Sequence, residues 1–210
     1  VNVMGDAGVF STAACMTSLD GVTFAVSAAT MFQLTLQNGW YNAPFSTRNA
    51  ASTYLNEVIH LAGAIATSGT NPIAFTLPAA HRPPVTVYLP IDLCSGAKGR
   101  LMITSSGNAT VVADNGVWTD AQCFTSLEGV TFPASTSAFS TLTLSNGWTP
   151  WTTRAPSYLN SAGIVRLAGS LSSGSNATMF TLPAGARPAK DIYVSADLCS
   201  GAPGRFRVQP

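Results

Sequence analysis

Two stretches of this sequence, residues 59–65 and 165–171, alternate apolar residues with small or polar ones. A period of two is typical of a β-strand that buries one face. Shorter runs rich in β-branched residues and bounded by Gly, Pro or Asn occur at 85–88, 101–103, 110–112 and 192–194. No window has the apolar stripe and caps of a helix. The pattern therefore predicts an all-β protein.

The chain also contains an internal repeat. Residues 15–24 match 123–132 and residues 34–40 match 142–148, both at an offset of 108. Further matches, at offsets of 106 or 105, are 61–63 with 167–169, 75–78 with 180–183, and 92–97 with 197–202. The offset changes by only three residues along the whole repeat, which indicates a duplication. Each copy holds roughly seven or eight short strands, which favours two tandem antiparallel β-sandwich repeats resembling jelly rolls.

The repeat sets the expected domain boundaries. We expect one repeat at residues 15–108 and the second at residues 109–210. Residues 1–14 would then supply a strand that completes a hairpin, either with the C-terminal strand or with a neighbouring copy. The first arrangement closes a ring of two units and the second extends an array. The array would make the sequence a piece of a longer protein.

Four cysteines limit the possible disulfides. Residues 105–108 read as a hairpin turn, and Cys94 and Cys123 lie 14 and 15 residues to either side of Asn108. This spacing favours a Cys94–Cys123 disulfide, and the repeat then pairs Cys15 with Cys199. The alternative is pairing within each unit, Cys15–Cys94 and Cys123–Cys199. Either scheme indicates an oxidising location or a particle that leaves the cell.

Composition excludes several partners. Charged residues make up 9% of the chain and the net charge is +1, so nucleic acid is a poor partner. No apolar run approaches the roughly 20 residues of a membrane-spanning helix, so we expect no membrane insertion. The low-charge, hydroxyl-rich composition suits an extracellular or virion-surface protein.

Residues suited to catalysis are few. The two histidines, His60 and His81, align with Arg166 and Ala186 in the other copy, and no Ser-His-Asp or Cys-His spacing is present. The repeated acids Asp20 and Glu128 precede Gly in predicted turns, where such residues are common. No Asp-x-Asp cluster suggests a calcium site. We therefore predict no enzyme, no catalytic residue, no metal and no cofactor, with a glycan-cleaving carboxylate pair as the weaker alternative.

Aromatic residues mark the candidate binding site. Each copy carries Asn-Gly-Trp, then a loop, then Tyr-Leu-Asn, with Tyr54 and Tyr158 at matching places. Aromatic faces with polar neighbours are suited to sugars. The candidate ligand-binding residues are Trp40, Tyr41 and Arg48 in the first copy and Trp148, Trp151 and Arg154 in the second. The alternative is that Trp40 and Trp148 plug the end of each sandwich.

These motifs also carry a family resemblance. The string Leu-x-Asn-Gly-Trp, Tyr-Leu-Asn, Gly-Ile-Val-Arg-Leu-Ala-Gly, Phe-Thr-Leu-Pro-Ala-Gly-Ala-Arg-Pro and Gly-Arg-Phe resembles a β-rich module of bacteriophage tail-fibre and minor tail proteins. It is also similar to domains of secreted or surface proteins of actinobacteria. The resemblance implies a non-enzymatic virion tail-fibre or cell-surface adhesion module that recognises host-surface glycan. A structural fibre subunit that contacts only a homo-oligomer or neighbouring repeats is the alternative.

Overall fold

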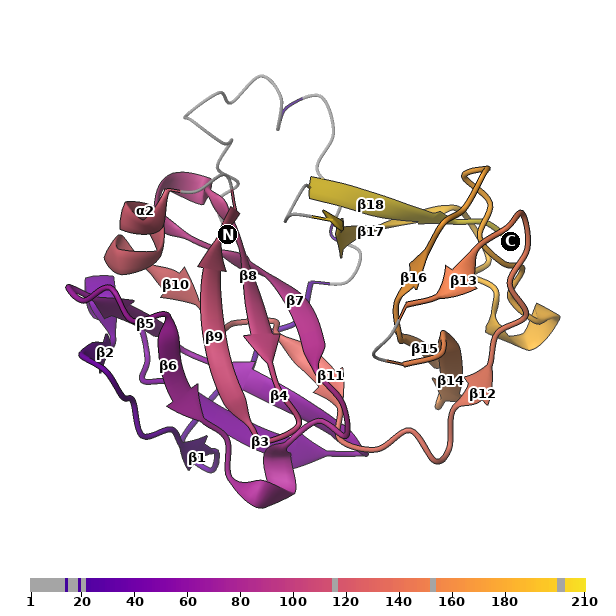
Figure 1. The fold of residues 1–210 in the computed structure, drawn as a ribbon. Coiled ribbons are helices and arrows are strands. Elements are labelled where there is room, and N and C mark those ends of the chain that lie inside the picture. The colour runs from indigo at the N-terminus through magenta and orange to yellow at the C-terminus, as the bar shows by residue number, and fades with distance from the viewer. Residues whose placement is uncertain (1–13, 15–18, 20–21, 115–116, 152–153, 200–202) are drawn as a thin grey trace.

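The computed structural model describes residues 14, 19, 22–114, 117–151, 154–199 and 203–210 (Figure 1). Most of the regular structure is antiparallel β-sheet, which confirms the all-β class. The strands are β1 (Phe32–Gln33), β2 (Trp40–Asn42), β3 (Ala51–Leu55), β4 (Val58–Ala62), β5 (Ala64–Thr67), β6 (Ile73–Thr76), β7 (Val87–Asp92), β8 (Lys98–Ile103), β9 (Asn108–Ala113), β10 (Thr125–Ser126), β11 (Thr131–Pro133), β12 (Ser140–Thr141), β13 (Thr149–Pro150), β14 (Ser157–Ser161), β15 (Ile164–Ala168), β16 (Leu171–Ser172), β17 (Ile192–Asp197) and β18 (Pro203–Val208).

Helical structure is short wherever the chain is described. One α-helix, α2 (Trp118–Cys123), is six residues long. The 3-10 turns are η2 (Pro44–Ser46), η3 (Ala79–His81), η4 (Cys94–Gly96) and η6 (Ala184–Ala186). The sequence pattern did not predict α2, because six residues are too few to show a helical apolar stripe. Among the described residues, no helix is both long and apolar enough to cross a bilayer.

Strands β1 to β11 form the first unit, on the left of Figure 1. Its three sheets have the strand orders β1-β3-β4-β11, β10-β5-β2 and β6-β9-β8-β7. In β8 every second side chain is buried, as expected for a strand with one face on a core. The central side chains of this core, including Ile59, Ile65, Phe75 and Leu101, are fully buried.

The last part of the first unit is a segment that we call the closing segment, residues 109–132. It begins in β9, which lies between β6 and β8, and continues through α2 to β10 and β11. Strand β10 pairs with β5, and β11 pairs with β4. In the sequence repeat these residues open the second copy. In the structure they belong to the sheets of the first unit, so the sequence repeat and the spatial unit are out of phase.

Strands β12 to β18 form the second unit, on the right of Figure 1. Its described sheets are smaller: β12-β14-β15, β13-β16 and β17-β18. Its buried cluster contains Leu142, Leu182 and Ala186, with Tyr158 and Phe180 packed against it. The two units share their local geometry, because the isolated bridge Leu144–Phe180 repeats the bridge Leu36–Phe75.

The hairpins β3–β4 and β14–β15 reveal a register that the sequence comparison did not show. Each hairpin turns on two residues with positive φ, Asn56-Glu57 and Ala162-Gly163, as a type I′ turn requires. Aligned on these turns, Tyr54 occupies the position of Asn160, because Tyr54 pairs with Ile59 and Asn160 pairs with Val165. The Tyr-Leu-Asn match is therefore displaced by two residues, and Tyr54 is not the spatial counterpart of Tyr158.

Candidate functional site

The Asn-Gly-Trp turns have the same hydrogen bonds in both units. The side-chain amides of Asn38 and Asn146 each donate to a carbonyl, of Ile73 and Thr178 respectively, at 2.8 Å. Both Asn residues have positive φ, which Asn tolerates better than most residues. The turn therefore ties the end of one strand to the strand opposite, and its Asn is engaged in structure.

The two repeated tryptophans are likewise engaged within their units. Trp40 Nε1 donates to the Asn71 carbonyl at 2.9 Å, and Trp148 Nε1 donates to the Asn176 carbonyl at 2.7 Å. Trp40 is buried, and its ring meets Trp118 edge-on with centroids 6.0 Å apart. Trp118 comes from the closing segment. Trp148 remains partly exposed. Trp40 thus plugs the first unit, as the alternative interpretation holds.

Two of the six predicted ligand-binding residues present open aromatic faces. Tyr41 and Trp151 are each about half exposed, at 53% and 52%. They do not occupy the same position in the two units: Trp151 N donates to Ser170 O as Ala43 N donates to Ala64 O, so Trp151 corresponds to Ala43, two residues after Tyr41. These rings can stack on a flat apolar surface such as a pyranose face.

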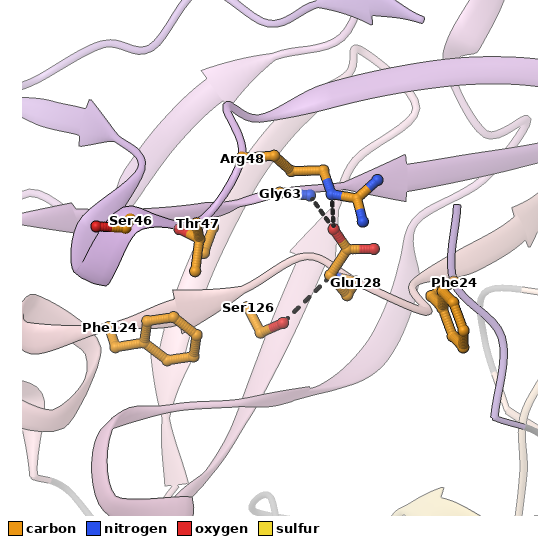
Figure 2. A pocket seen from close by; sticks show the side chains of 9 residues that line it. Phe24, Ser46, Thr47, Arg48, Gly63, Phe124, Ser126 and Glu128 are labelled. Atoms are coloured by element: carbon orange, nitrogen blue, oxygen red, sulfur yellow. Dashed lines mark hydrogen bonds and ion pairs between the residues drawn. The ribbon is translucent and has the colours of Figure 1, made fainter. Parts of the chain in front are cut away.

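The arginines have a different environment. Arg48 Nε lies 2.9 Å from Glu128 Oε1, and the same oxygen accepts the Gly63 amide at 2.8 Å (Figure 2). A second guanidinium nitrogen, Arg48 Nη1, donates to Ala25 O at 2.7 Å. Arg48 therefore holds two other chain segments, the closing segment at Glu128 and the strand entry at Ala25.

A depression of about 510 Å³ surrounds this ion pair. Phe24 and Phe124 line it together with Arg48 and Glu128 (Figure 2). Glu128 was interpreted from the sequence only as a turn residue, and its partner lies 80 positions away. The available signal was that both members of the pair recur, as Arg154 and Asp20, in a chain with few charges.

Gly63 shows why the glycine of the Leu-Ala-Gly motif is needed here. Its φ is +91°, and a Cβ would collide with the Asn49 carbonyl. Gly169 has φ +98° and a Cβ there would meet Ala155 O at 2.7 Å. The bend between the motif's strand and the next one is therefore the same in both units.

Arg154 occupies the position of Arg48 in the second unit. The Arg48 carbonyl accepts the amide of Ala64 at 3.1 Å, and the Arg154 carbonyl accepts the amide of Ser170 at 3.3 Å. Arg154 Nε and Nη1 are buried, and they have no hydrogen-bond partner within the described ranges. This burial lowers the pKa of Arg154. Among the described residues, no carboxylate takes the place beside Arg154 that Glu128 has beside Arg48.

The histidines do not form a catalytic arrangement in the described structure. His81 Nδ1 lies 2.8 Å from Ser52 Oγ, but Ser52 is fully buried and no substrate could reach it. Burial lowers the pKa of His81, and burial followed by the charge of Arg166 lowers the pKa of His60. No group of three or more His, Cys, Asp or Glu within the described residues is placed to hold a metal ion.

The cysteines follow the hairpin scheme where they are described. Cys94 and Cys123 form a disulfide, with Cα atoms 5.7 Å apart. This bond joins the end of the β7 region to the closing segment, and it excludes the alternative pairs Cys15–Cys94 and Cys123–Cys199. Cys199 is exposed. Cys15 lies outside the described residues, so its pairing with Cys199 stays a prediction.

Comparison with known proteins does not add an identity to this geometry. No family model matches the chain. No curated protein and no solved structure matches it either.

Proposed function

We propose that this chain is a non-enzymatic structural module of an extracellular or virion-surface fibre, built from two tandem antiparallel β-sandwich units that resemble jelly rolls. One observation carries the proposal. The polar and aromatic side chains that both units share make contacts inside their own unit. Asn38, Trp40 and Arg82 each donate to a main-chain carbonyl, and so do their counterparts in the second unit.

The contacts made by the side chains that both units share support a scaffold rather than a ligand site. In a repeated ligand site the shared polar groups would be available to a ligand, whereas here they are engaged in hydrogen bonds that fix turns and strand ends, even where the residue itself is exposed, as Asn38 and Asn146 are. The Cys94–Cys123 disulfide is compatible with a secreted protein. In this proposal the partners of the chain are copies of itself or neighbouring repeats.

A polysaccharide assay tests the non-enzymatic part of this proposal. The purified chain is incubated with a panel of bacterial surface polysaccharides, and new reducing ends are measured over time. We expect no turnover. Turnover that scales with protein concentration and is lost in the variant Glu128→Gln would overturn the proposal in favour of a glycan-cleaving enzyme.

Glycan recognition is the second candidate function, favoured by the exposed rings of Tyr41 and Trp151. A glycan array compares the wild type with Trp151→Ala, Tyr41→Ala and the control Tyr88→Ala, an exposed aromatic residue on β7. An adhesin loses signal roughly tenfold with the first two changes and keeps it with the third. Equal signals from all four proteins would exclude this candidate.

A further inference from the structure

The closing segment supplies a large share of the first unit's buried surface. Leu127, Val130 and Phe132 are at most 4% exposed, and all three lie in the main core. The segment also provides β9 in the middle of a four-stranded sheet and the two strands that pair with β4 and β5. The first unit is therefore complete only with residues 109–132 in place.

The second unit contains the strands that would accept such a segment, and apolar side chains on them are exposed. In β4, which pairs with β11, Val58 and Leu61 are 3% and 2% exposed, whereas their counterparts Ile164 and Leu167 in β15 are 58% and 38% exposed. The β17–β18 hairpin, equivalent to β7–β8, forms a sheet of two strands in the described structure. A third strand beside β18 would correspond to β9.

The sequence contains a second closing segment, residues 1–24, which aligns with 109–132 at an offset of 108. Its described apolar residues Leu19, Val22 and Phe24 align with Leu127, Val130 and Phe132, yet they are 74%, 62% and 69% exposed. At the start of the segment, the sequence places Val1 and Val3 at the positions of the buried Ala109 and Val111. Apolar residues thus stand at all five of these positions, each of which the first unit fills with a buried apolar side chain.

Charge complements this apolar match. In the first unit Arg48 binds Glu128 of the closing segment. In the second unit the counterpart Arg154 has two buried guanidinium nitrogens without a partner in the described part of the chain. The residue at the Glu128 position of the second closing segment is Asp20. Burying a charge without a partner is unfavourable, so a carboxylate delivered to Arg154 stabilises the assembled state.

Two observations indicate that the closing segment of the second unit comes from another molecule. We call residues 1–24 the donor segment and the strands that receive it the acceptor. Within one chain the donor side chains Leu19, Val22 and Phe24 and the acceptor side chains of β15 all stay exposed. The end of the donor segment is also held at the first unit of its own molecule, because Phe24 lines the depression beside Glu128 and the next residue, Ala25, accepts a hydrogen bond from Arg48. A contact between a donor on one unit and an acceptor on the other is heterologous, which generates open chains unless the rotation closes.

We propose that residues 1–24 of one copy insert into the second unit of another copy and close it, as residues 109–132 close the first unit within one chain. The inserted segment adds a strand beside β18, pairs with β15 and β16, and brings Asp20 to Arg154. This inference rests on the proposed structural function and gives it a mechanism of assembly: head-to-tail strand exchange between copies of the chain.

Light scattering after gel filtration of the full chain tests the proposal. We expect a mass that rises with concentration through a series of head-to-tail oligomers. Leu19→Asp removes the donor anchor and should leave a monomer. The matched control is Val26→Asp, since Val26 is 95% exposed and lies outside the segment. It introduces the same charge and should leave the oligomers intact. A monomeric wild type, including one closed on its own residues 1–24, or oligomers that survive Leu19→Asp, would overturn the proposal.

A complementation experiment distinguishes the loss of the contact between copies from misfolding of the variants. Leu167→Asp blocks the acceptor, so this variant and Leu19→Asp should each be monomeric alone. Mixed, they should form a dimer of one copy of each, because only one good donor and one good acceptor remain. If no mixed dimer forms, strand exchange is wrong while the proposed function stands. Polysaccharide turnover would overturn the proposed function without affecting the mixed dimer.

Discussion

The two units have closely matched strand sequences, but the apolar side chains of these strands are buried to a different extent. In the first unit β4 pairs with β11 and its apolar side chains are buried, whereas Ile164 and Leu167 at the matching positions of β15 in the second unit are exposed. In both units the tryptophan donates to the carbonyl of an equivalent Asn, and the glycine of the Leu-Ala-Gly motif has a positive φ. The difference teaches that the strands and turns encode the shape of a unit, while the closing segment supplies the burial that stabilises it.

Removing an aromatic ring from the closing segment should have the largest effect on stability. Phe132→Ala opens a cavity in the core of the first unit and should lower its free energy of unfolding by about 3–5 kcal/mol. The counterpart change Phe24→Ala affects an exposed ring and should lie within about 0.5 kcal/mol of the wild type. Urea unfolding of dilute protein, with hydrogen exchange in β4 and β15 to separate the units, measures both. Equal losses from the two changes would mean that residues 1–24 already close a unit within one chain.

The sequence predicted the features that are local or repeated. The Asn-Gly turns and the Cys94–Cys123 pair follow from spacing along a few dozen residues, and the structure contains them. Residues 59–65 were predicted as one half-buried strand, but a bend at Gly63 divides them into β4 and β5, whose side chains are almost all buried. The phase of the spatial unit could not be predicted in this way, because a tandem repeat can be divided at any point. Only the pairing of β10 and β11 with β5 and β4 shows where a unit ends.

The candidate site was predicted less well, for a physical reason. Exposure separates Tyr41 and Trp151 from Trp40, and exposure depends on which distant segments cover each ring. The role of Arg48 depends on Glu128, a contact that forms only when the closing segment folds back across the unit. Composition can identify such residues as unusual, but it cannot assign their partners.

Replacing each of the two arginines with Met should have a smaller effect on stability, and the effect should differ between the two units. Arg48→Met breaks the ion pair with Glu128 and the bond to Ala25 O, and should lower the stability of the first unit by about 1 kcal/mol. Arg154→Met replaces a guanidinium whose buried nitrogens have no partner among the described residues, so the second unit of a monomer should be unchanged or more stable. The same urea and hydrogen-exchange measurements apply. A marked loss of stability in monomeric Arg154→Met would show that this guanidinium is already paired.

The smallest expected effect is a dependence of stability on pH. It also tests whether the charge of Arg166 in the second unit acts on His60 in the first. Burial, and then the charge of Arg166, lower the pKa of His60 in the folded chain below its ordinary value near 6.5. Burial shifts the pKa of His81 in the same direction. The unfolded chain then binds protons more readily than the folded chain, so stability should be constant above pH 6.5 and fall as the pH drops below it.

Comparison of variants assigns this pH dependence to His60 and Arg166, which lie on equivalent strands of the two units, β4 and β15. Urea midpoints are measured at pH 7.5 and 5.5. His60→Gln should reduce the fall in the midpoint, and Arg166→Gln should reduce it by a smaller amount, because burial is the larger cause. His81→Gln serves as the control that leaves the Arg166 contribution in place. If Arg166→Gln left the pH dependence of the wild type unchanged, the charge of Arg166 would not reach His60.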